Sequence, residues 1–234
     1  MTMGCDLIQV AGLVPFTTID YPGCLSAVIF CQGCPWACGY CHNPHLQPIS
    51  LKGSLSWDKT LSLLGERRGF LDAVVFSGGE PLLQRNLGEG MQQIKDLGMK
   101  VGIHTAGIYP RKLKEILKYL DWVGMDIKAP FHSYEKITRV RQSGKGPKES
   151  AALILQSGVD YEFRTTVHPD LLSSEDLYGV AQELKEMKAD TFVLQKFRSN
   201  GCGDADLNKT GSFSMDFQLI QYLQESFVNF MIRE

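Results

Sequence analysis

Four cysteines near the start of the chain are the residues best suited to chemistry. Cys31, Cys34, Cys38 and Cys41 fall within eleven residues. Thiolates are soft ligands that suit zinc or iron–sulfur clusters, although small cysteines can also simply fill a core. A four-thiolate zinc site usually pairs two short Cys-x2-Cys hairpins across a longer gap, whereas these four cysteines share one short stretch.

The first of these cysteines differs from the other three. Cys31 continues the apolar run 28–30, where a core position is expected. Without it the motif is Cys34-x3-Cys38-x2-Cys41, which offers three thiolates. Three ligands on a four-iron cluster leave one iron open, and an open coordination position is a catalytic arrangement. The spacing therefore favours a catalytic iron–sulfur cluster over structural zinc.

A glycine-rich turn follows the second predicted strand. It contains Gly78, Gly79 and Glu80 in the sequence Ser-Gly-Gly-Glu-Pro. One interpretation is a turn that ends the strand, with Glu80 starting the next helix. The other is that the glycines expose backbone carbonyls and Glu80 adds negative charge, which together suit a bound ammonium group.

Further polar side chains stand on the later predicted strands. Thr105 follows the third strand, and Asp126 and Lys128 end the fourth. Asp126 and Lys128 are two residues apart, so they share one face of an extended chain. Arg164 lies on the fifth strand, where it is either a buried salt-bridge partner or a cofactor contact.

Six short β-branched or aromatic runs alternate with segments of helical spacing, and they predict the elements that must position these side chains. The runs are residues 25–30, 73–76, 100–104, 122–127, 161–167 and 191–195. Six strand–helix units predict a parallel sheet, because each right-handed crossover returns the chain in the same direction. We therefore expect an α/β fold, a partial (β/α)6 barrel of the TIM type with parallel strands, whose functional groups lie at the carboxyl ends of the strands.

The helical segments carry more specific predictions. Apolar residues recur at helical spacing over 113–120 and over 217–227, which predicts a helix in each. Ser173 with Asp176 three residues later predicts a capping box at the start of another helix. The length of 234 residues suits a single domain, 1–234, with a short leader over 1–24.

Composition and charge exclude several classes of protein. The 24 basic and 26 acidic side chains give a net charge of −2, which argues against a nucleic-acid binder that works through a basic field. No apolar run approaches the roughly 20 residues that span a bilayer, so no membrane association is expected. The odd count of seven cysteines and the absence of a secretory signal over 1–10 indicate a reducing compartment, so we expect a cytoplasmic protein.

The cysteine motif resembles that of a known superfamily. Cys34-x3-Cys38-x2-Cys41 after a strand is similar to the signature of radical S-adenosylmethionine (SAM) enzymes. The wider string 32–43 resembles the activating enzymes of glycyl-radical enzymes. The leader 16–23 and the total length resemble the proteins that activate anaerobic ribonucleoside-triphosphate reductase.

This resemblance implies cofactors and a set of site residues. Cys34, Cys38 and Cys41 would hold a [4Fe–4S] cluster whose open iron binds SAM, and reduction would release a 5′-deoxyadenosyl radical. The Gly-Gly-Glu segment would contact the methionyl amino group, Lys128 the methionyl carboxylate, and hydroxyl groups the ribose region. The residues expected to bind the cofactor are Tyr40, Gly78, Gly79, Glu80, Thr105, Asp126, Lys128 and Arg164.

His104 departs from the resemblance. Relatives often carry Asp there, which helps to bind a monovalent cation in some activating enzymes. That cation site is therefore not carried over to this chain. His104 itself is expected to pack in the core or to support a site residue, rather than to bind a metal.

The resemblance also implies partners and leaves two alternatives open. The radical would be passed to a glycine of a glycyl-radical enzyme, with an anaerobic ribonucleotide reductase as the expected partner. Residues 45–201 contain no cysteine, so one cluster is expected, with flavodoxin or ferredoxin as electron donor. The alternatives are a radical SAM enzyme that acts on a small molecule, such as a 7-carboxy-7-deazaguanine synthase, and a non-catalytic zinc module.

Overall fold

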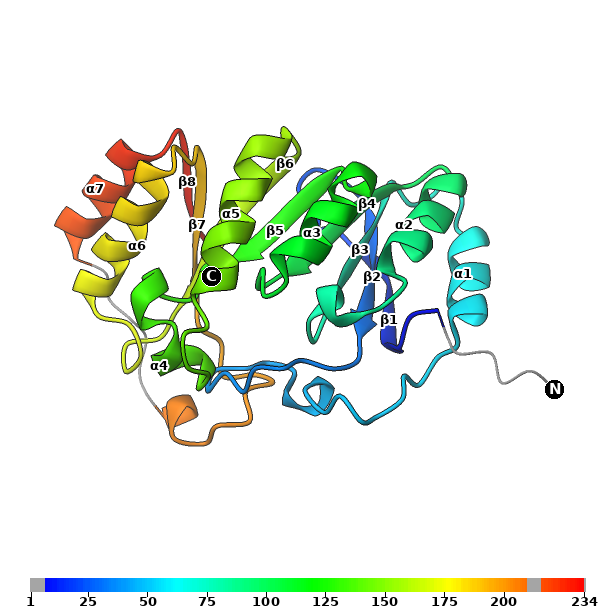
Figure 1. Cartoon of the computed structure of the whole chain (residues 1–234), viewed down its shortest axis with the longest axis horizontal. Helices are drawn as coiled ribbons and strands as arrows, with labels where there is room; N and C mark the ends of the chain where they lie inside the picture. The colour runs from blue at the N-terminus through cyan, green and yellow to red at the C-terminus, as the bar shows by residue number, and fades with distance from the viewer. Residues whose placement is uncertain (1–6, 210–215, 234) are drawn as a thin grey trace. The chain divides into compact units, whose positions relative to one another are not determined.

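A computed structural model describes residues 7–209 and 216–233, in which strands and helices alternate along the chain (Figure 1). The strands are β1 Val10–Thr17, β2 Ser26–Cys31, β3 Ala73–Gly78, β4 Lys100–Thr105, β5 Trp122–Asp126, β6 Asp160–Val167, β7 Thr191–Lys196 and β8 Asn229–Arg233. The α-helices are α1 Trp57–Gly65, α2 Leu87–Asp96, α3 Pro110–Ile116, α4 Glu135–Thr138, α5 Lys145–Ser157, α6 Ser174–Glu186 and α7 Phe217–Ser226. Single 3-10 turns are η1 Pro44–Leu46, η2 Pro81–Leu83, η3 Leu117–Tyr119, η4 Phe131–Ser133 and η5 Leu207–Lys209.

The chain divides into two compact units. The first is made of Met1–Pro35, His45–Thr105 and Arg111–Val123, and the second of Trp36–Pro44, Ala106–Pro110 and Gly124–Glu234. The cysteine motif is thereby divided, because Cys34 belongs to the first unit and Cys38 and Cys41 to the second.

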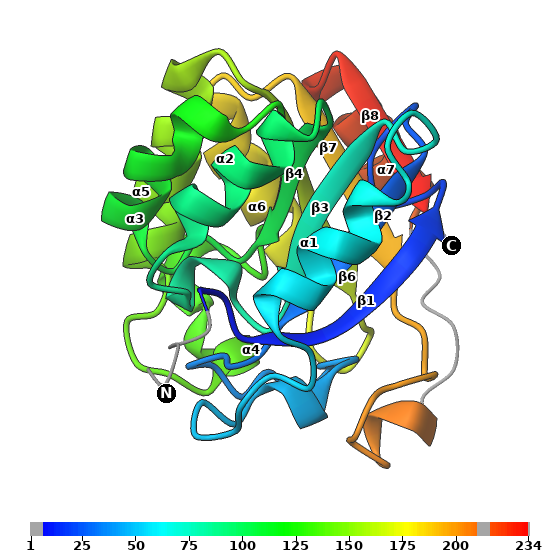
Figure 2. The same cartoon turned by 90° about the vertical axis from the view of Figure 1, so that its right-hand side faces the viewer.

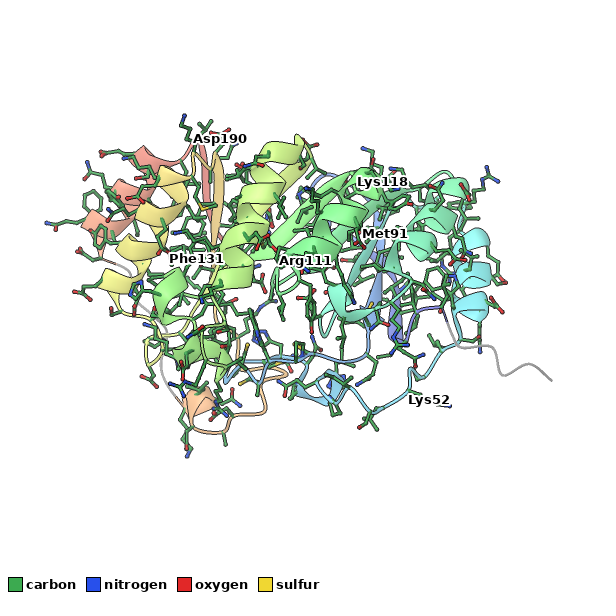
Figure 3. All side chains as sticks on the ribbon, in the orientation of Figure 1. Lys52, Met91, Arg111, Lys118, Phe131 and Asp190 are labelled. Carbon is green, nitrogen blue, oxygen red and sulfur yellow. The ribbon has the colours of Figure 1, made fainter. Side chains whose placement is uncertain are left out.

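The first unit contains β1 to β4 in chain order. β2 pairs in parallel with β3, and β3 with β4, whereas β1 is antiparallel to β2. Figure 2 shows β1, β2 and β3 side by side. The apolar run Ala73–Phe76 is fully buried, as expected for a parallel strand that is covered on both faces. Helix packing completes this core, since Met91 of α2, labelled in Figure 3, is also fully buried.

The second unit contains β6, β7 and β8, which pair in parallel. The end of β5 is tied to β6, because the Ile127 N–H donates to the Arg164 carbonyl at 2.7 Å and the Thr165 hydroxyl donates to the Ile127 carbonyl at 2.6 Å. α6 and α7 pack on each other through Tyr178 and Tyr222, whose ring centroids are 5.1 Å apart. The two hydrogen bonds at Ile127 fix the end of β5 against β6, and several predicted site residues lie on these two strands or next to them.

The six predicted strands are confirmed as β2 to β7, each with its ends within two residues of the prediction. The capping box is confirmed as well, since the Ser173 side chain accepts from the Asp176 N–H and the Asp176 side chain accepts from the Ser173 N–H. The structure adds two strands that were not predicted. They are β1, which lies inside the expected leader, and β8.

Two predicted helices end differently in the structure. The helix predicted over 113–120 is α3 followed by the 3-10 turn η3, and Leu120 is already extended before β5. In the last helix Phe227 is extended and lies outside α7, while Phe217 is 76% exposed. The buried face of α7 is formed by Leu219 and Leu223. Of the apolar residues that predicted this helix, Leu223 and Phe227 are buried, whereas Phe217, directly after the Asp216 cap, is exposed.

No helix in the described part of the chain combines the length and the apolar character that crossing a bilayer requires.

Candidate functional site

The cysteine motif begins directly after β2. The Gly33 N–H donates to the Leu46 carbonyl at 2.8 Å, and the Cys34 N–H donates to the Gln47 carbonyl at 3.0 Å. Leu46 and Gln47 belong to the first unit like Cys34 itself. The backbone therefore fixes Cys34, which forms no disulfide and is partly exposed.

The predicted Gly-Gly-Glu turn packs on the same stretch of backbone. The Gly79 N–H donates to the Cys31 carbonyl at 2.9 Å, and the Glu80 N–H donates to the Gly33 carbonyl at 2.9 Å. A Cβ atom on Gly79 would stand 2.2 Å from the Gly33 carbonyl oxygen. Gly78 has a φ of +104°, and a Cβ atom there would lie 2.5 Å from the Cys31 nitrogen. Both positions therefore require glycine because two backbone segments approach closely.

The Glu80 carboxylate is buried, with 1% of the residue exposed. Its Oε1 accepts from the Leu82 N–H at 3.0 Å, so Glu80 caps η2 as the first interpretation of this turn expected. The same oxygen accepts from the Thr105 hydroxyl at 2.7 Å. The structure thus brings together two of the predicted site residues, from the ends of β3 and β4.

Cys31 has the environment of a core residue. It is fully buried in β2, and this burial, together with the charge of Glu80, raises the pKa of its thiol far above the usual value. The Cys31 thiol is consequently neutral at neutral pH, unlike a metal-bound thiolate.

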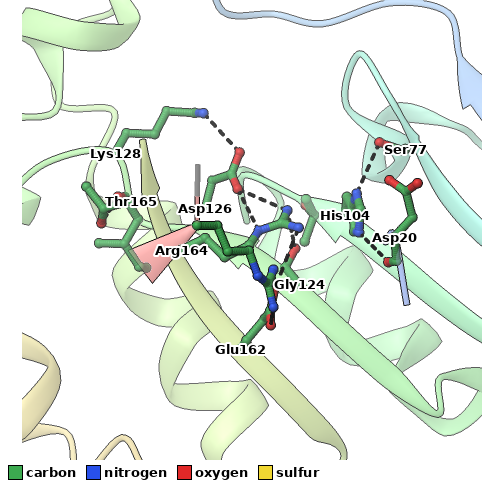
Figure 4. Close-up of polar contacts among 12 residues, drawn as sticks. Asp20, Ser77, His104, Gly124, Asp126, Lys128, Glu162, Arg164 and Thr165 are labelled. Atoms are coloured by element: carbon green, nitrogen blue, oxygen red, sulfur yellow. Dashed lines mark hydrogen bonds and ion pairs between the residues drawn. The ribbon is translucent and has the colours of Figure 1, made fainter. Parts of the chain in front are cut away.

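His104 makes the contacts of a packing residue. Its Nε2 donates to the Asp20 carbonyl at 2.9 Å, and its Nδ1 lies 3.4 Å from the Ser77 hydroxyl (Figure 4). Its ring also meets the Trp122 ring edge-on, with 5.5 Å between the centroids.

In the second unit Asp126 lies between two cations (Figure 4). The Arg164 Nε and one of its terminal nitrogens lie 3.1 and 3.0 Å from Asp126 Oδ1, and the Lys128 Nζ lies 3.3 Å from Asp126 Oδ2. Arg164 also donates to the Gly124 carbonyl at 3.2 Å. Three predicted site residues from β5, its end and β6 therefore form one charged group.

Lys128 is nearly buried and connects this group to the cysteine motif. Its Nζ lies 5.5 Å from the centroid of the Tyr40 ring, within range of a cation–π interaction. Burial by itself lowers the pKa of the Lys128 ammonium, but the surrounding Tyr40, Asp126 and Cys38 outweigh it and hold that pKa well above the usual value. Lys128 is therefore a permanent positive charge at neutral pH.

Two groups in the Cys38–Cys41 stretch are affected by burial. Burial raises the pKa of the Cys38 thiol, and the positive charge of Lys128 opposes that rise. The Tyr40 hydroxyl is buried, and among the described residues it finds no hydrogen-bond partner. Leaving such a group unsatisfied costs about 1–3 kcal/mol, so this position suits a ligand or a water molecule that would bond it.

The segment 197–209 holds the end of the cysteine motif. The His42 ring stacks on Phe197 at 5.5 Å, and its Nε2 donates to the Arg198 carbonyl at 2.8 Å. The other end of the segment is held by the buried His168, whose Nε2 donates to the Leu207 carbonyl at 2.9 Å. His42 directly follows Cys41, so this segment restrains a predicted ligand through its neighbour.

Sequence reasoning missed three residues around the charged group. The Tyr134 hydroxyl accepts from the Lys128 N–H at 3.1 Å, and no spacing signal pointed to it. Glu162 lies two residues before Arg164 on β6, so alternation along the strand could have placed both on one face. Arg233 binds Glu162 from β8, a strand that was not predicted.

The sequence is similar to known proteins over most of its length. The profile of the Radical SAM superfamily matches residues 28–189. The chain is 32% identical over 207 residues to a protein of Methanocaldococcus jannaschii named "Putative glycyl-radical enzyme activating enzyme MJ1227". The match covers 86% of this chain and 84% of that protein. It is 30% identical over 212 residues to the pyruvate formate-lyase-activating enzyme of Clostridium pasteurianum, with the same 86% and 84% covered.

Solved structures with the same fold have lower sequence identity. SuiB of Streptococcus suis bound to the precursor peptide SuiA matches with a TM-score of 0.67 at 18% identity, over 88% of this chain and 48% of SuiB. The chain thus spans about half of SuiB. QueE of Escherichia coli matches with a TM-score of 0.55 at 15% identity, over 97% of this chain and 94% of QueE. These likenesses confirm the predicted fold class, an α/β partial barrel with mostly parallel strands.

Proposed function

Because the chain belongs to the radical SAM superfamily, we propose that it is an activating enzyme that generates a glycyl radical on an anaerobic ribonucleotide reductase. The observation that carries this proposal is the similarity to two activating enzymes over 86% of the chain. The leader 16–23, which resembles the activating proteins of ribonucleotide reductases, favours that partner over other glycyl-radical enzymes.

The chemistry of the side chains fits an iron–sulfur cluster. Cys34, Cys38 and Cys41 form no disulfide and are partly exposed, and they have the three-ligand spacing that leaves one iron open. These three residues would hold the [4Fe–4S] cluster. With SAM bound, such a cluster supplies one-electron cleavage of SAM and hence a 5′-deoxyadenosyl radical. Cys31 remains a core residue in this proposal.

The polar residues fit the two ends of an amino acid. The buried Glu80 carboxylate, held by Thr105 beside Gly78 and Gly79, would receive an ammonium group. The permanently charged Lys128 would receive a carboxylate. Each is a group that the methionyl part of SAM carries, and the chemistry of each residue within its own unit supports its assignment to SAM.

The remaining predicted residues would orient and shield the cofactor. Asp126 binds Lys128 and is itself bound by Arg164, and Asp126 and Arg164 would border the ribose region. The unsatisfied Tyr40 hydroxyl would gain a hydrogen-bond partner from the bound ligand. Trp36 and Tyr40 are buried aromatic residues within the cysteine motif and would exclude water from the cluster. An external flavodoxin or ferredoxin would supply the electron.

The proposal is tested by electron paramagnetic resonance of candidate partners. The purified protein is mixed anaerobically with SAM, a reductant and either an anaerobic ribonucleotide reductase or a pyruvate formate-lyase from the same source. A doublet-type glycyl radical signal is expected on the reductase. A variant reductase whose radical glycine is replaced by Ala is the matched control and is expected to give no signal.

The other outcomes separate the alternatives. A signal on the lyase alone would keep the activating function but overturn the partner. SAM-dependent turnover of a small molecule without any radical on either protein would overturn the activating function. Stoichiometric zinc without iron or labile sulfide, after anaerobic purification, would overturn the radical chemistry altogether.

A further inference from the structure

A row of five charged side chains extends from the end of β5 to β8. In order they are Lys128, Asp126, Arg164, Glu162 and Arg233. The first three belong to the proposed SAM site, and Figure 4 shows them with Glu162. The last two lie beyond that site and have no role in the function proposed above.

The pairing register explains how Arg233 reaches β6. Arg233 stands opposite Gln195 on β7, and Gln195 stands opposite Thr166 on β6. Partners across neighbouring strands point to the same face, as do alternate residues of one strand. Arg233 therefore shares a face with Glu162 and Arg164.

Arg233 binds Glu162 with both terminal nitrogens. The distances to Glu162 Oε1 and Oε2 are 2.6 and 2.7 Å, a bidentate arrangement. The Glu162 side chain is only 4% exposed, so its negative charge needs a partner inside the protein. Arg233 meets that need almost entirely by itself.

Arg164 is shared unequally between two carboxylates as a result. It lies 3.0–3.1 Å from Asp126 Oδ1 but 4.0 Å from Glu162 Oε1. The side chain of Asp126 is 33% exposed and that of Glu162 4%, so solvent can compensate Asp126 more readily than Glu162. If Arg233 were absent, Arg164 would be drawn to the buried Glu162 and away from Asp126.

The row carries three cations and two anions. The excess positive charge is suited to an anionic group of a ligand, such as the carboxylate assigned to Lys128. Without Arg233 the row would have no excess charge.

We propose that Arg233, acting through Glu162, is a positioning residue that keeps Arg164 on Asp126 and thereby prepares the charged group for SAM. This inference rests on the proposed function. Arg233 itself is not expected to touch SAM, so its effect should disappear when Glu162 no longer carries a charge.

The test is a double-mutant cycle on SAM affinity. The dissociation constant of SAM is measured under anaerobic conditions for the cluster-loaded wild type, Arg233→Gln, Glu162→Gln and the double variant. Arg233→Gln is expected to weaken SAM binding about tenfold, which is the effect of losing one charge-assisted hydrogen bond. The bond lost here is the one between Arg164 and Asp126. The double variant is expected to bind more tightly than Arg233→Gln alone, because the competing carboxylate is gone. A purely structural role would instead give losses that add.

Two further variants serve as controls. Arg141→Gln removes an exposed arginine of the same unit and is expected to leave the affinity unchanged, which excludes an effect of net charge. If Arg233→Gln fails to fold, Arg233→Lys keeps the charge without the bidentate geometry and is expected to bind SAM more weakly than the wild type. Thermal denaturation of each variant monitors folding.

The outcomes that overturn the inference are distinct from those that overturn the function. If Arg233→Gln, or Arg233→Lys in its place, binds SAM as tightly as the wild type, the positioning role is overturned and the proposed function still stands. A double variant as weak as the sum of both losses would do the same. Wild type that loads a cluster but does not bind SAM would overturn both.

Discussion

The two glycines at the end of β3 are required by packing as much as by any ligand. Gly78 and Gly79 lie against the backbone of Cys31 and Gly33, and each leaves no room for a Cβ atom. The same contact directs Glu80 inward, where Thr105 binds it. A change at this contact should therefore affect both the stability of the first unit and the geometry around Cys34.

Gly79→Ala tests this contact. The added Cβ would stand 2.2 Å from the Gly33 carbonyl oxygen. Because the backbone fixes the position of a Cβ atom as well as that of a carbonyl oxygen, no side-chain rotation relieves this contact. We expect a loss of at least ~2 kcal/mol in the free energy of unfolding, measured by urea denaturation, and a reduced iron content after anaerobic reconstitution.

Gly12→Ala in β1 is the matched control, because nothing lies within 4 Å of its Cβ position. It is expected to unfold like the wild type. A Gly79→Ala protein with wild-type stability and iron content would show that the two backbone segments are not in contact.

Only some of the residue-scale arrangement could be predicted. Asp126 and Lys128 were placed together correctly, because alternation on a strand fixes the face of each side chain. The Tyr134 hydroxyl on Lys128 could not be predicted, since this contact comes from a loop whose course depends on packing. The roles of the individual site residues stay predictions.

The segment 197–209 is the element that restrains the second half of the cysteine motif. It has little regular structure and is held by two histidines, His42 and His168, through backbone carbonyls. Gly201 allows the close approach, because its φ is +89° and a Cβ atom there would lie 2.7 Å from the His42 carbonyl oxygen. The position of Cys41 should therefore depend on this segment.

Gly201→Ala is expected to loosen the contact. Ala at this φ costs at least ~1 kcal/mol, and the added methyl group would push the segment away from His42. We expect faster loss of the visible cluster absorbance when the reconstituted protein is exposed to air, together with a lower melting temperature.

Gly158→Ala is the control from the same unit. Its φ is +74°, so it carries the same backbone strain as Gly201→Ala, but nothing lies within 4 Å of its Cβ position. Its cluster should decay at the wild-type rate. Equal decay in both variants and in wild type would contradict the restraining role.

At the element scale the prediction succeeded where burial is strong. The six runs that became β2 to β7 are apolar because helices and strands cover them. β1 contains Gly12 and Pro15 and is partly exposed, so it carries neither strand propensity nor clean alternation. β8 has five residues and none of them is fully buried, so the pattern was too weak to indicate it.

For the whole molecule, the sequence predicted the fold class and the superfamily, and both are confirmed. This was possible because a three-cysteine motif and a regular strand–helix alternation are local features. The partner depends on surfaces that meet another protein, and these leave no periodic signal in one chain. The partner therefore stays a proposal, as does the single-domain organisation.

The most direct test of the central claim measures reductive cleavage of SAM. Wild-type protein with a reconstituted cluster, dithionite and SAM is expected to produce 5′-deoxyadenosine and methionine. Cys34→Ala, Cys38→Ala and Cys41→Ala are each expected to lose this activity, whereas Cys24→Ala and Cys31→Ala should retain it. Sustained 5′-deoxyadenosine formation by any of the first three variants would contradict the three-thiolate cluster on which this account depends.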